Sequence, residues 1–184
     1  MMILYICRTP VAKSRDLAAK CGIHFASASG IPTFNPVIAE QEHGKPYFSA
    51  CPEICFSTSH SGQYWACAVT DDGPVGLDIQ QIRPARQQAI VTRHFAPEEI
   101  AFWRRGGNFF DLWCSKESYT KYCGKGLSMG LASFSTVYGG SICGHALGCT
   151  FTLFRFAEGY HACLCTRGET RFSTEWVQPD GRPE

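Results

Sequence analysis

The chain has 184 residues, which is enough for one sizeable domain or for two small halves packed together. Its 45% hydrophobic and 18% charged residues exclude global disorder, and a formal net charge of +1 identifies no partner. The 11 cysteines are scattered, odd in number and without a C-x-x-C pair, so they indicate reduced thiols in a cytoplasmic protein instead of disulfides or a zinc site.

The beginning of the chain is predicted to form a strand followed by a helix. Residues 1–7 are an apolar run that is too short for the core of a signal peptide or for a membrane span, so we expect a buried strand and no membrane association. Thr9 and Pro10 then suit the cap and the first position of a helix. We expect this helix to run to about Lys20 and to stop at Gly22.

Three extended segments follow in the first half. Residues 56–59 and 64–70 have the composition of strands, and the Asp-Asp-Gly-Pro sequence at 71–74 predicts a tight turn. Residues 75–80 resume the strand pattern after this turn. The sequence therefore predicts a β-hairpin over residues 64–80.

Helices dominate the middle of the chain. Residues 84–93 and 97–105 are predicted helices, and the second opens with Pro97 and acidic residues in its first turn. The longest helical pattern covers residues 109–123 and is closed by Gly124. Apolar segments typical of strands follow at 133–138, 150–156 and 161–166.

This order of elements predicts an α+β fold made of two halves. We expect an N-terminal half at 1–83, a C-terminal half at 84–172, and a loosely held polar tail at 173–184. The two halves are expected to meet near Arg83.

The segment at 75–80 presents the first chemically informative pattern. Because side chains alternate along a strand, Asp78 and Gln80 lie on the opposite face from the apolar residues, next to the small Gly76. A carboxylate beside an amide oxygen suits a hard cation such as Mg²⁺. The simpler alternative is an Asp that only caps a turn near the end of a strand.

The helix at 109–123 carries a second pattern. Glu117 and Lys121 are four residues apart and share a face, which Trp113 joins one turn earlier. The pair is either a surface salt bridge or a second metal carboxylate followed by a phosphate-binding lysine. The basic, glycine-rich residues 124–126 would then let a phosphate ligand come close.

A third pattern surrounds His60 at residues 57–61. Three serines and a threonine accompany the histidine, and such donors suit phosphate oxygens. A turn that satisfies its own hydroxyls is the simpler interpretation. A Ser/His nucleophilic pair is a further alternative, although residues 57–62 do not resemble the G-x-S-x-G motif.

The order and spacing of these motifs resemble the Sfp-type phosphopantetheinyl transferases. The resemblance covers roughly residues 41–166. The motifs that carry it are QEHGKP (41–46), FSTSHSG (56–62), PVGLDIQ (74–80), FAPEE (95–99), WCSKESYTK (113–121), GKGLS (124–128) and LASFS (131–135).

The resemblance implies a fold and an activity. The fold would be two similar α/β halves related by a pseudo-twofold axis, with the active site in the cleft between them. The enzyme would transfer 4′-phosphopantetheine from coenzyme A to a serine of an apo acyl or peptidyl carrier protein and release 3′,5′-ADP, with Mg²⁺ as cofactor. We expect a cytoplasmic monomer, in effect a pseudo-dimer, that binds no nucleic acid.

The resemblance also implies roles for individual residues. The catalytic residues would be Glu117, Lys121 and His60, and the metal ligands would be Asp78, Glu117 and Gln80. Coenzyme A would contact Gly44, Lys45, Pro46, Ser59, His60 and Lys121, with Arg15 near its 3′-phosphate. Gln80 stands where the family usually has Glu, which removes one negative charge from the metal site.

Two further expectations concern the partners. Residues 83–125 contain eight Lys or Arg against four Asp or Glu, and we expect this basic stretch to dock the acidic carrier protein through Arg104 and Arg105. Phe102, Trp103, Phe109 and Phe110 would form its apolar part or, alternatively, simply belong to the core. A non-catalytic binder of coenzyme A or of a carrier protein is the competing function, and a structural protein without a ligand is a third alternative.

Overall fold

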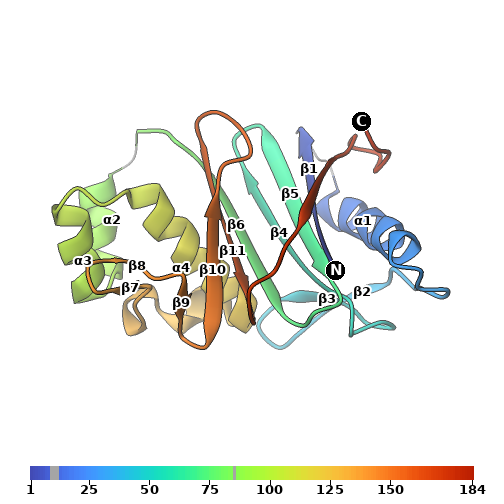
Figure 1. The fold of residues 1–184 in the computed structure, drawn as a ribbon, viewed down its shortest axis with the longest axis horizontal. Coiled ribbons are helices and arrows are strands. Elements are labelled where there is room, and N and C mark those ends of the chain that lie inside the picture. Colours follow the sequence, from blue (N-terminus) through green and yellow to red (C-terminus); the bar gives the residue numbers. More distant parts are fainter. Residues whose placement is uncertain (9–12, 85) are drawn as a thin grey trace.

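The computed structural model describes residues 1–8, 13–84 and 86–184. In these residues the chain forms two four-stranded sheets, with α1 on one outer side and α2, α3 and α4 on the other (Figure 1). The helices are α1 (Ser14–Ala28), α2 (Gln87–His94), α3 (Pro97–Arg104) and α4 (Phe109–Cys123). The strands are β1 (Met2–Arg8), β2 (Ile38–Glu40), β3 (Pro46–Phe48), β4 (Cys55–Ser61), β5 (Tyr64–Thr70), β6 (Val75–Gln81), β7 (Val137–Tyr138), β8 (Ser141–Ile142), β9 (His145–Ala146), β10 (Cys149–Phe154), β11 (Tyr160–Thr166) and β12 (Ser173–Trp176).

The two sheets have closely related connectivities. The first has the strand order β12-β1-β5-β4 and the second has the order β6-β11-β10-β9. In each, a strand is followed by a helix and then by an antiparallel pair, and the last strand of the pair lies between the other two. The α+β class expected from the sequence is confirmed.

Alternating side chains explain why the sheets and helices form layers. One face of β1 and β5 packs against one face of β6 and β11, and the opposite face of β1 packs against α1. The apolar residues of β1 and β6 that meet between the sheets are Met2, Leu4, Ile6, Val75, Leu77 and Ile79. The other face of β6 is therefore free to receive α4.

The predicted hairpin over residues 64–80 is wrong. β5 pairs with β1 on one side and with β4 on the other, so both of its edges are taken. After the turn, β6 leaves for the second sheet and pairs with β11. By strand pairing, the second sheet thus begins at Val75, not after Arg83, and it includes Asp78.

The first helix also differs from its prediction. Its expected start at Thr9 and Pro10 lies outside the described residues. At the other end, α1 continues past Gly22 to Ala28. Gly22 faces the ring of Phe48, and a Cβ there would lie 2.6 Å from the ring's Cζ atom. Gly22 therefore allows close packing inside the helix and does not end it.

The C-terminal segment is folded, which corrects the expectation of a loose polar tail. β12 pairs in parallel with β1, and Trp176 contacts the ring of Tyr64 edge-on. Val177 is buried and donates its backbone N–H to the carbonyl of Ile6. The segment is held by backbone pairing and by these apolar side chains, while Asp180, Arg182 and Glu184 remain at the surface.

Candidate active site

The site begins where α4 crosses β6. Gly76 lies directly beneath the helix, and a Cβ at this position would overlap the carbonyl oxygen of Ser118. The glycine is required here for the close approach of two backbones. The next residue of β6 on the face that meets α4 is Asp78, which is 3% exposed.

The ends of α4 agree with the predicted bounds, and they determine which residues of the helix face β6. The Asn108 side chain accepts the backbone N–H groups of Phe110 and Asp111, and Gly124 ends the helix in the left-handed region with φ of +71°. With these ends, Lys121 faces Asp78.

Lys121 and Asp78 form the central ion pair. The Lys121 Nζ lies 2.8 Å from Asp78 Oδ1, 2.9 Å from the carbonyl oxygen of Leu77 and 3.1 Å from Ser59 Oγ. These contacts occupy all three ammonium protons. A phosphate oxygen would therefore replace one of these acceptors.

Gln80 approaches the second oxygen of the same carboxylate. Its Nε2 donates to Asp78 Oδ2 at 3.2 Å, and its Oε1 accepts the hydroxyl of Ser61 at 3.4 Å. The structure therefore brings Gln80 to Asp78, as the strand alternation predicts.

Glu117 has a buried oxygen with no hydrogen-bond partner among the described residues. Burial raises the pKa of Glu117, the negative charge of Asp78 raises it further, and Lys121 opposes the shift. The unpartnered atom is Oε1. A buried, ionised carboxylate without a partner has an unfavourable free energy unless it meets a cation or a proton donor.

These residues fit a magnesium ion in the chemistry of their donors. Asp78 and Glu117 carry carboxylate oxygens and Gln80 carries an amide oxygen, all of which are hard donors. The Gln80 oxygen accepts the Ser61 hydroxyl in this structure, so the amide would have to turn over to offer it to a cation. Within residues 1–8, 13–84 and 86–184, no cluster of three or more His, Cys, Asp or Glu side chains could hold a metal. The candidate set therefore has two carboxylates, and water or substrate oxygens would complete it.

A pocket of about 220 Å³ adjoins the Lys121 side chain. Its lining residues are His43, Gly44, Lys45, Pro46, Phe56, Ser57, Thr58, Lys121, Gly124 and Gly126. The structure thus brings the predicted Gly44, Lys45 and Pro46 together with the C-terminal end of α4. Gly44 has φ of +80°, which suits the turn between β2 and β3.

Lys45 has an internal partner set. Its Nζ donates to the carbonyls of Val75 and Tyr122 at 3.2 and 3.1 Å, and burial lowers its pKa. The ammonium thereby satisfies a carbonyl in the last turn of α4, where positive charge is favourable. Lys45 thus holds the pocket wall against both β6 and α4.

The remaining predicted residues lie at the edge of the site or outside it. His60 is exposed and shares a face of β4 with Thr58, which lines the pocket. Arg15, in the first turn of α1, forms an exposed ion pair with Glu40 on β2.

One supporting contact was missed by the sequence interpretation. Lys116, which directly precedes Glu117, is fully buried, and its Nζ lies 2.8 and 2.6 Å from the two carboxylate oxygens of Glu99 on α3. The same ammonium donates to the carbonyl of Phe134 at 2.8 Å. The signal available in the sequence was a lysine on an otherwise inward-facing side of the helix.

Residues 74–165, half of the chain, match the 4'-phosphopantetheinyl transferase superfamily. The chain belongs to this family. A 4'-phosphopantetheinyl transferase of Bacillus subtilis is 40% identical over 116 residues, which cover 60% of this chain and 51% of that protein. The 4'-phosphopantetheinyl transferase psf-1 of Bacillus pumilus is 32% identical over 149 residues, covering 74% and 63%.

A third relative carries the name used for the resemblance above. The 4'-phosphopantetheinyl transferase Sfp of Bacillus subtilis (strain 168) is 39% identical over 101 residues, which cover 52% of this chain and 44% of that protein. The chain thus spans between 44% and 63% of the lengths of these three relatives.

Proposed function

We propose that this protein transfers 4′-phosphopantetheine from coenzyme A to a serine of an apo carrier protein and releases 3′,5′-ADP. The names of the relatives support the transferase activity. The observation that carries the proposal is the unpartnered, buried oxygen of Glu117 beside the Asp78–Lys121 ion pair. It marks a site that is incomplete without a cation or a reacting group.

Asp78, Glu117 and Gln80 would hold the magnesium ion in this proposal. When bound, the ion would polarise the pyrophosphate of coenzyme A as a Lewis acid. The chain's own contribution is to keep two carboxylates close together in a desolvated place. Lys121 offsets part of their repulsion, since it contacts Asp78 directly and opposes the rise in the pKa of Glu117.

The reaction needs no covalent intermediate with the enzyme. The serine oxygen of the carrier attacks the β-phosphorus of coenzyme A, and the bond to the leaving 3′,5′-ADP breaks. Glu117 accepts the serine proton directly or through a water, for which a raised pKa is favourable. Lys121 and His60 stabilise negative charge on the phosphate oxygens.

The pocket beside Lys121 is the proposed place of the nucleotide. Gly44, Lys45 and Pro46 would lie against the adenine end, and His60 would reach a phosphate at the rim of β4. We place Arg15 near the 3′-phosphate, where the anion would compete with Glu40 for the guanidinium. Both Arg15 and its partner are exposed, so this exchange has a low cost.

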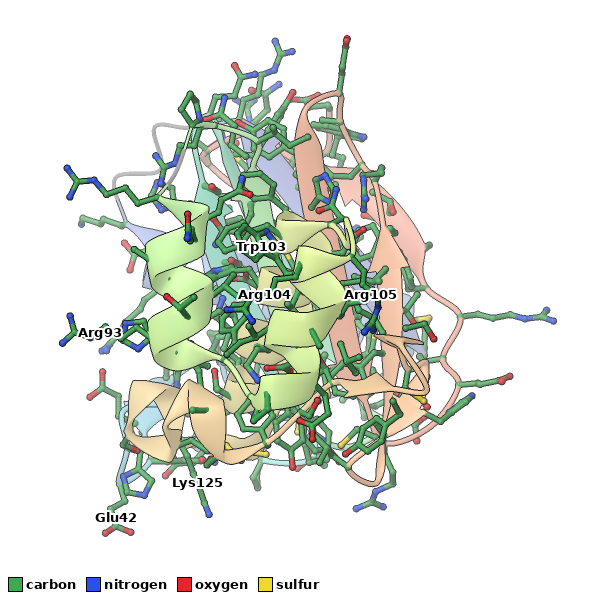
Figure 2. All side chains as sticks on the ribbon, turned by 90° about the vertical axis from the view of Figure 1, so that its left-hand side faces the viewer. Glu42, Arg93, Trp103, Arg104, Arg105 and Lys125 are labelled. Carbon is green, nitrogen blue, oxygen red and sulfur yellow. The ribbon has the colours of Figure 1, made fainter. Side chains whose placement is uncertain are left out.

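The carrier protein would dock on the face formed by α2 and α3 (Figure 2). Arg93, Arg104 and Arg105 are exposed there and suit an acidic partner. The expected apolar part of this surface needs a correction. Phe109 and Phe110 are 6% and 8% exposed and belong to the core, whereas Phe102 and Trp103 are partly buried beside it.

The working form of the protein is proposed to be a cytoplasmic monomer whose two halves are related by a pseudo-twofold axis. The related strand orders of the two sheets support the relation between the halves. None of the helices in the described part of the chain has the length and apolar character needed to span a membrane. We propose coenzyme A and the carrier as its partners, and no nucleic acid.

One experiment separates this function from non-catalytic binding. The protein is mixed with an apo carrier domain, coenzyme A and Mg²⁺, and the mass of the carrier is measured. We expect a gain of one phosphopantetheine that disappears with EDTA and with Glu117→Gln. Binding of coenzyme A without a mass gain on any of an acyl, a peptidyl and a polyketide carrier would contradict the transferase activity.

A further inference from the structure

Three alternate serines of β4 join the two sheets. The Oγ atoms of Ser57, Ser59 and Ser61 accept the backbone N–H groups of Leu77, Ile79 and Gln81 of β6 at 3.0, 3.1 and 3.0 Å. Side chains thus replace a backbone ladder between β4 and β6. We call this row of three hydrogen bonds the serine seam.

Ser59 makes two contacts that Ser57 and Ser61, the other serines of the seam, do not share. Its hydroxyl also donates to Asp78 Oδ1 at 2.9 Å and accepts the Lys121 ammonium at 3.1 Å. A serine hydroxyl has one proton and two lone pairs. Asp78 takes the proton, while the Ile79 N–H and Lys121 take the lone pairs. The side chain is therefore fully used inside the protein, and the residue is 8% exposed.

In this arrangement Asp78, Lys121 and the backbone of β6 use the whole hydrogen-bonding capacity of Ser59. A ligand oxygen or nitrogen could bond Ser59 only by displacing Asp78, Lys121 or the backbone of β6. By contrast, Thr58 and Lys121 line the pocket.

We propose that Ser59 is a positioning residue that fixes the rotamer of Asp78 and the place of the Lys121 ammonium. Its hydroxyl is held by the backbone of β6 and in turn holds the Asp78 carboxylate. The position of this carboxylate therefore depends on how the two sheets are aligned. The inference rests on the proposed function in one respect, namely that Asp78 and Glu117 bind a divalent cation. Groups that orient a metal ligand contribute about 10- to 100-fold in affinity or activity.

The first test compares Ser59→Ala with Ser57→Ala. Ser57→Ala removes an equivalent bond of the seam without touching Asp78, so it is the matched control for metal binding. Ser57 lines the pocket, so it is no control for coenzyme A. Mn²⁺ affinity is measured without coenzyme A, and coenzyme A affinity is measured with EDTA present. Activity assays supply kcat and the KM for coenzyme A.

We expect Ser59→Ala to lower Mn²⁺ affinity and kcat by about 10- to 100-fold. Its metal-free affinity for coenzyme A should fall much less than its Mn²⁺ affinity, because Lys121 keeps its bonds to Asp78 and to the carbonyl of Leu77. Ser57→Ala should bind Mn²⁺ like the unchanged protein. Ser59→Thr, which keeps the hydroxyl, should recover most of the Mn²⁺ affinity.

Two results would overturn the proposal. If Ser59→Ala weakens metal-free coenzyme A binding and leaves Mn²⁺ binding intact, Ser59 is a ligand of the nucleotide. If Ser59→Ala and Ser57→Ala lose the same Mn²⁺ affinity, the serine only holds the sheets together.

A second measurement remains valid if the proposed function fails. Unfolding of metal-free Ser59→Ala, Lys121→Met and the double variant is followed in urea. The hydrogen bond between the two residues predicts that their effects are not additive. Additive effects would contradict the positioning role, whatever reaction the protein catalyses.

Discussion

At the scale of single residues, Glu117 combines an unpartnered oxygen with a raised pKa. Its ordinary pKa is 4.5, and burial together with Asp78 shifts it upward in the folded state. Between these two pKa values the folded state binds more protons than the unfolded state, so the free energy of unfolding falls as pH rises. Each unit of difference corresponds to about 1.4 kcal/mol. Glu117 thus lowers the stability of the metal-free protein at neutral pH.

Glu117→Gln is therefore expected to be more stable than the unchanged protein at pH 7 and to lose transferase activity. The stability difference should shrink as pH falls through the raised pKa of folded Glu117, and it should be smallest below 4.5, where Glu117 becomes protonated in the unfolded state as well. Urea unfolding in EDTA from pH 4 to pH 8 measures it. A difference that does not depend on pH would show that the charge of Glu117 carries no cost.

Gln80 stabilises the Asp78 carboxylate in the metal-free protein. The Gln80 amide donates to Asp78 Oδ2, and a glutamate at 80 would replace this donor by a negative charge. We expect Gln80→Glu to destabilise the metal-free protein by about 1 kcal/mol and to increase Mn²⁺ affinity about tenfold. It should also lower the Mg²⁺ concentration for half-maximal rate. An unchanged Mn²⁺ affinity would place residue 80 outside the metal shell.

At the scale of elements, α4 is held from the side opposite the site by a buried ion pair. Lys116 and Glu99 are both fully buried, and Glu99 Oε1 also accepts the backbone N–H of Thr136 at 2.8 Å. The Lys116 ammonium lies 4.1 Å from the centre of the Phe134 ring. The pair thus joins α3, α4 and the segment after it, and it fixes the rotation of the helix that carries Glu117.

Removing one partner of this pair should be more harmful than removing both charges. Lys116→Met leaves Glu99 buried without its counter-charge, and we expect a loss of about 3–5 kcal/mol in unfolding free energy. Lys116→Met combined with Glu99→Gln should recover much of this loss. Thermal and urea unfolding measure both variants. A double variant as unstable as the single one would mean that packing, not charge, dominates at this position.

The sequence predicts elements better than their pairing, and the reasons are local. The bounds of α4 follow from Asn108 and Gly124, which act within one turn of the helix. Strand β6 was also expected from its alternation, but its partner β11 lies far along the chain and leaves no local signal. The predicted hairpin failed for this reason. β6 joins the second sheet because both edges of β5 are already paired, with β1 and with β4.

In the candidate site, too, contacts within one element were predictable from the sequence and contacts between elements were not. Asp78 and Gln80 come together as their spacing on β6 predicts, whereas the contact of Lys121 with Asp78 was expected only from the resemblance to the family. The environment of Ser59 was not predictable, because its three partners come from two further elements and only the folded chain brings them to one hydroxyl. The alternation of serines at 57, 59 and 61 was visible, and it could have placed all three on one face of β4.

At the scale of the whole molecule, the exposed charges are unevenly placed. α2 and α3 lie at the opposite end from α1 and the C-terminus (Figure 1), and they carry Arg93, Arg104 and Arg105 at the surface (Figure 2). The positive charge of Lys116 is neutralised inside, so it adds nothing to this face. An acidic carrier would therefore be attracted mainly by the arginines.

Charge reversal at this face should affect the carrier and not coenzyme A. We expect Arg104→Glu with Arg105→Glu to raise the carrier concentration for half-maximal rate about tenfold at low salt, and less at high salt because of screening. Lys20→Glu with Arg182→Glu is the matched control. It changes the net charge equally, but at the α1 end of the molecule, where Lys20 lies beside Gly181. If both double variants weaken carrier use equally, net charge and not this face attracts the carrier. A change in coenzyme A affinity for the Arg104 and Arg105 variant would contradict a separate docking surface.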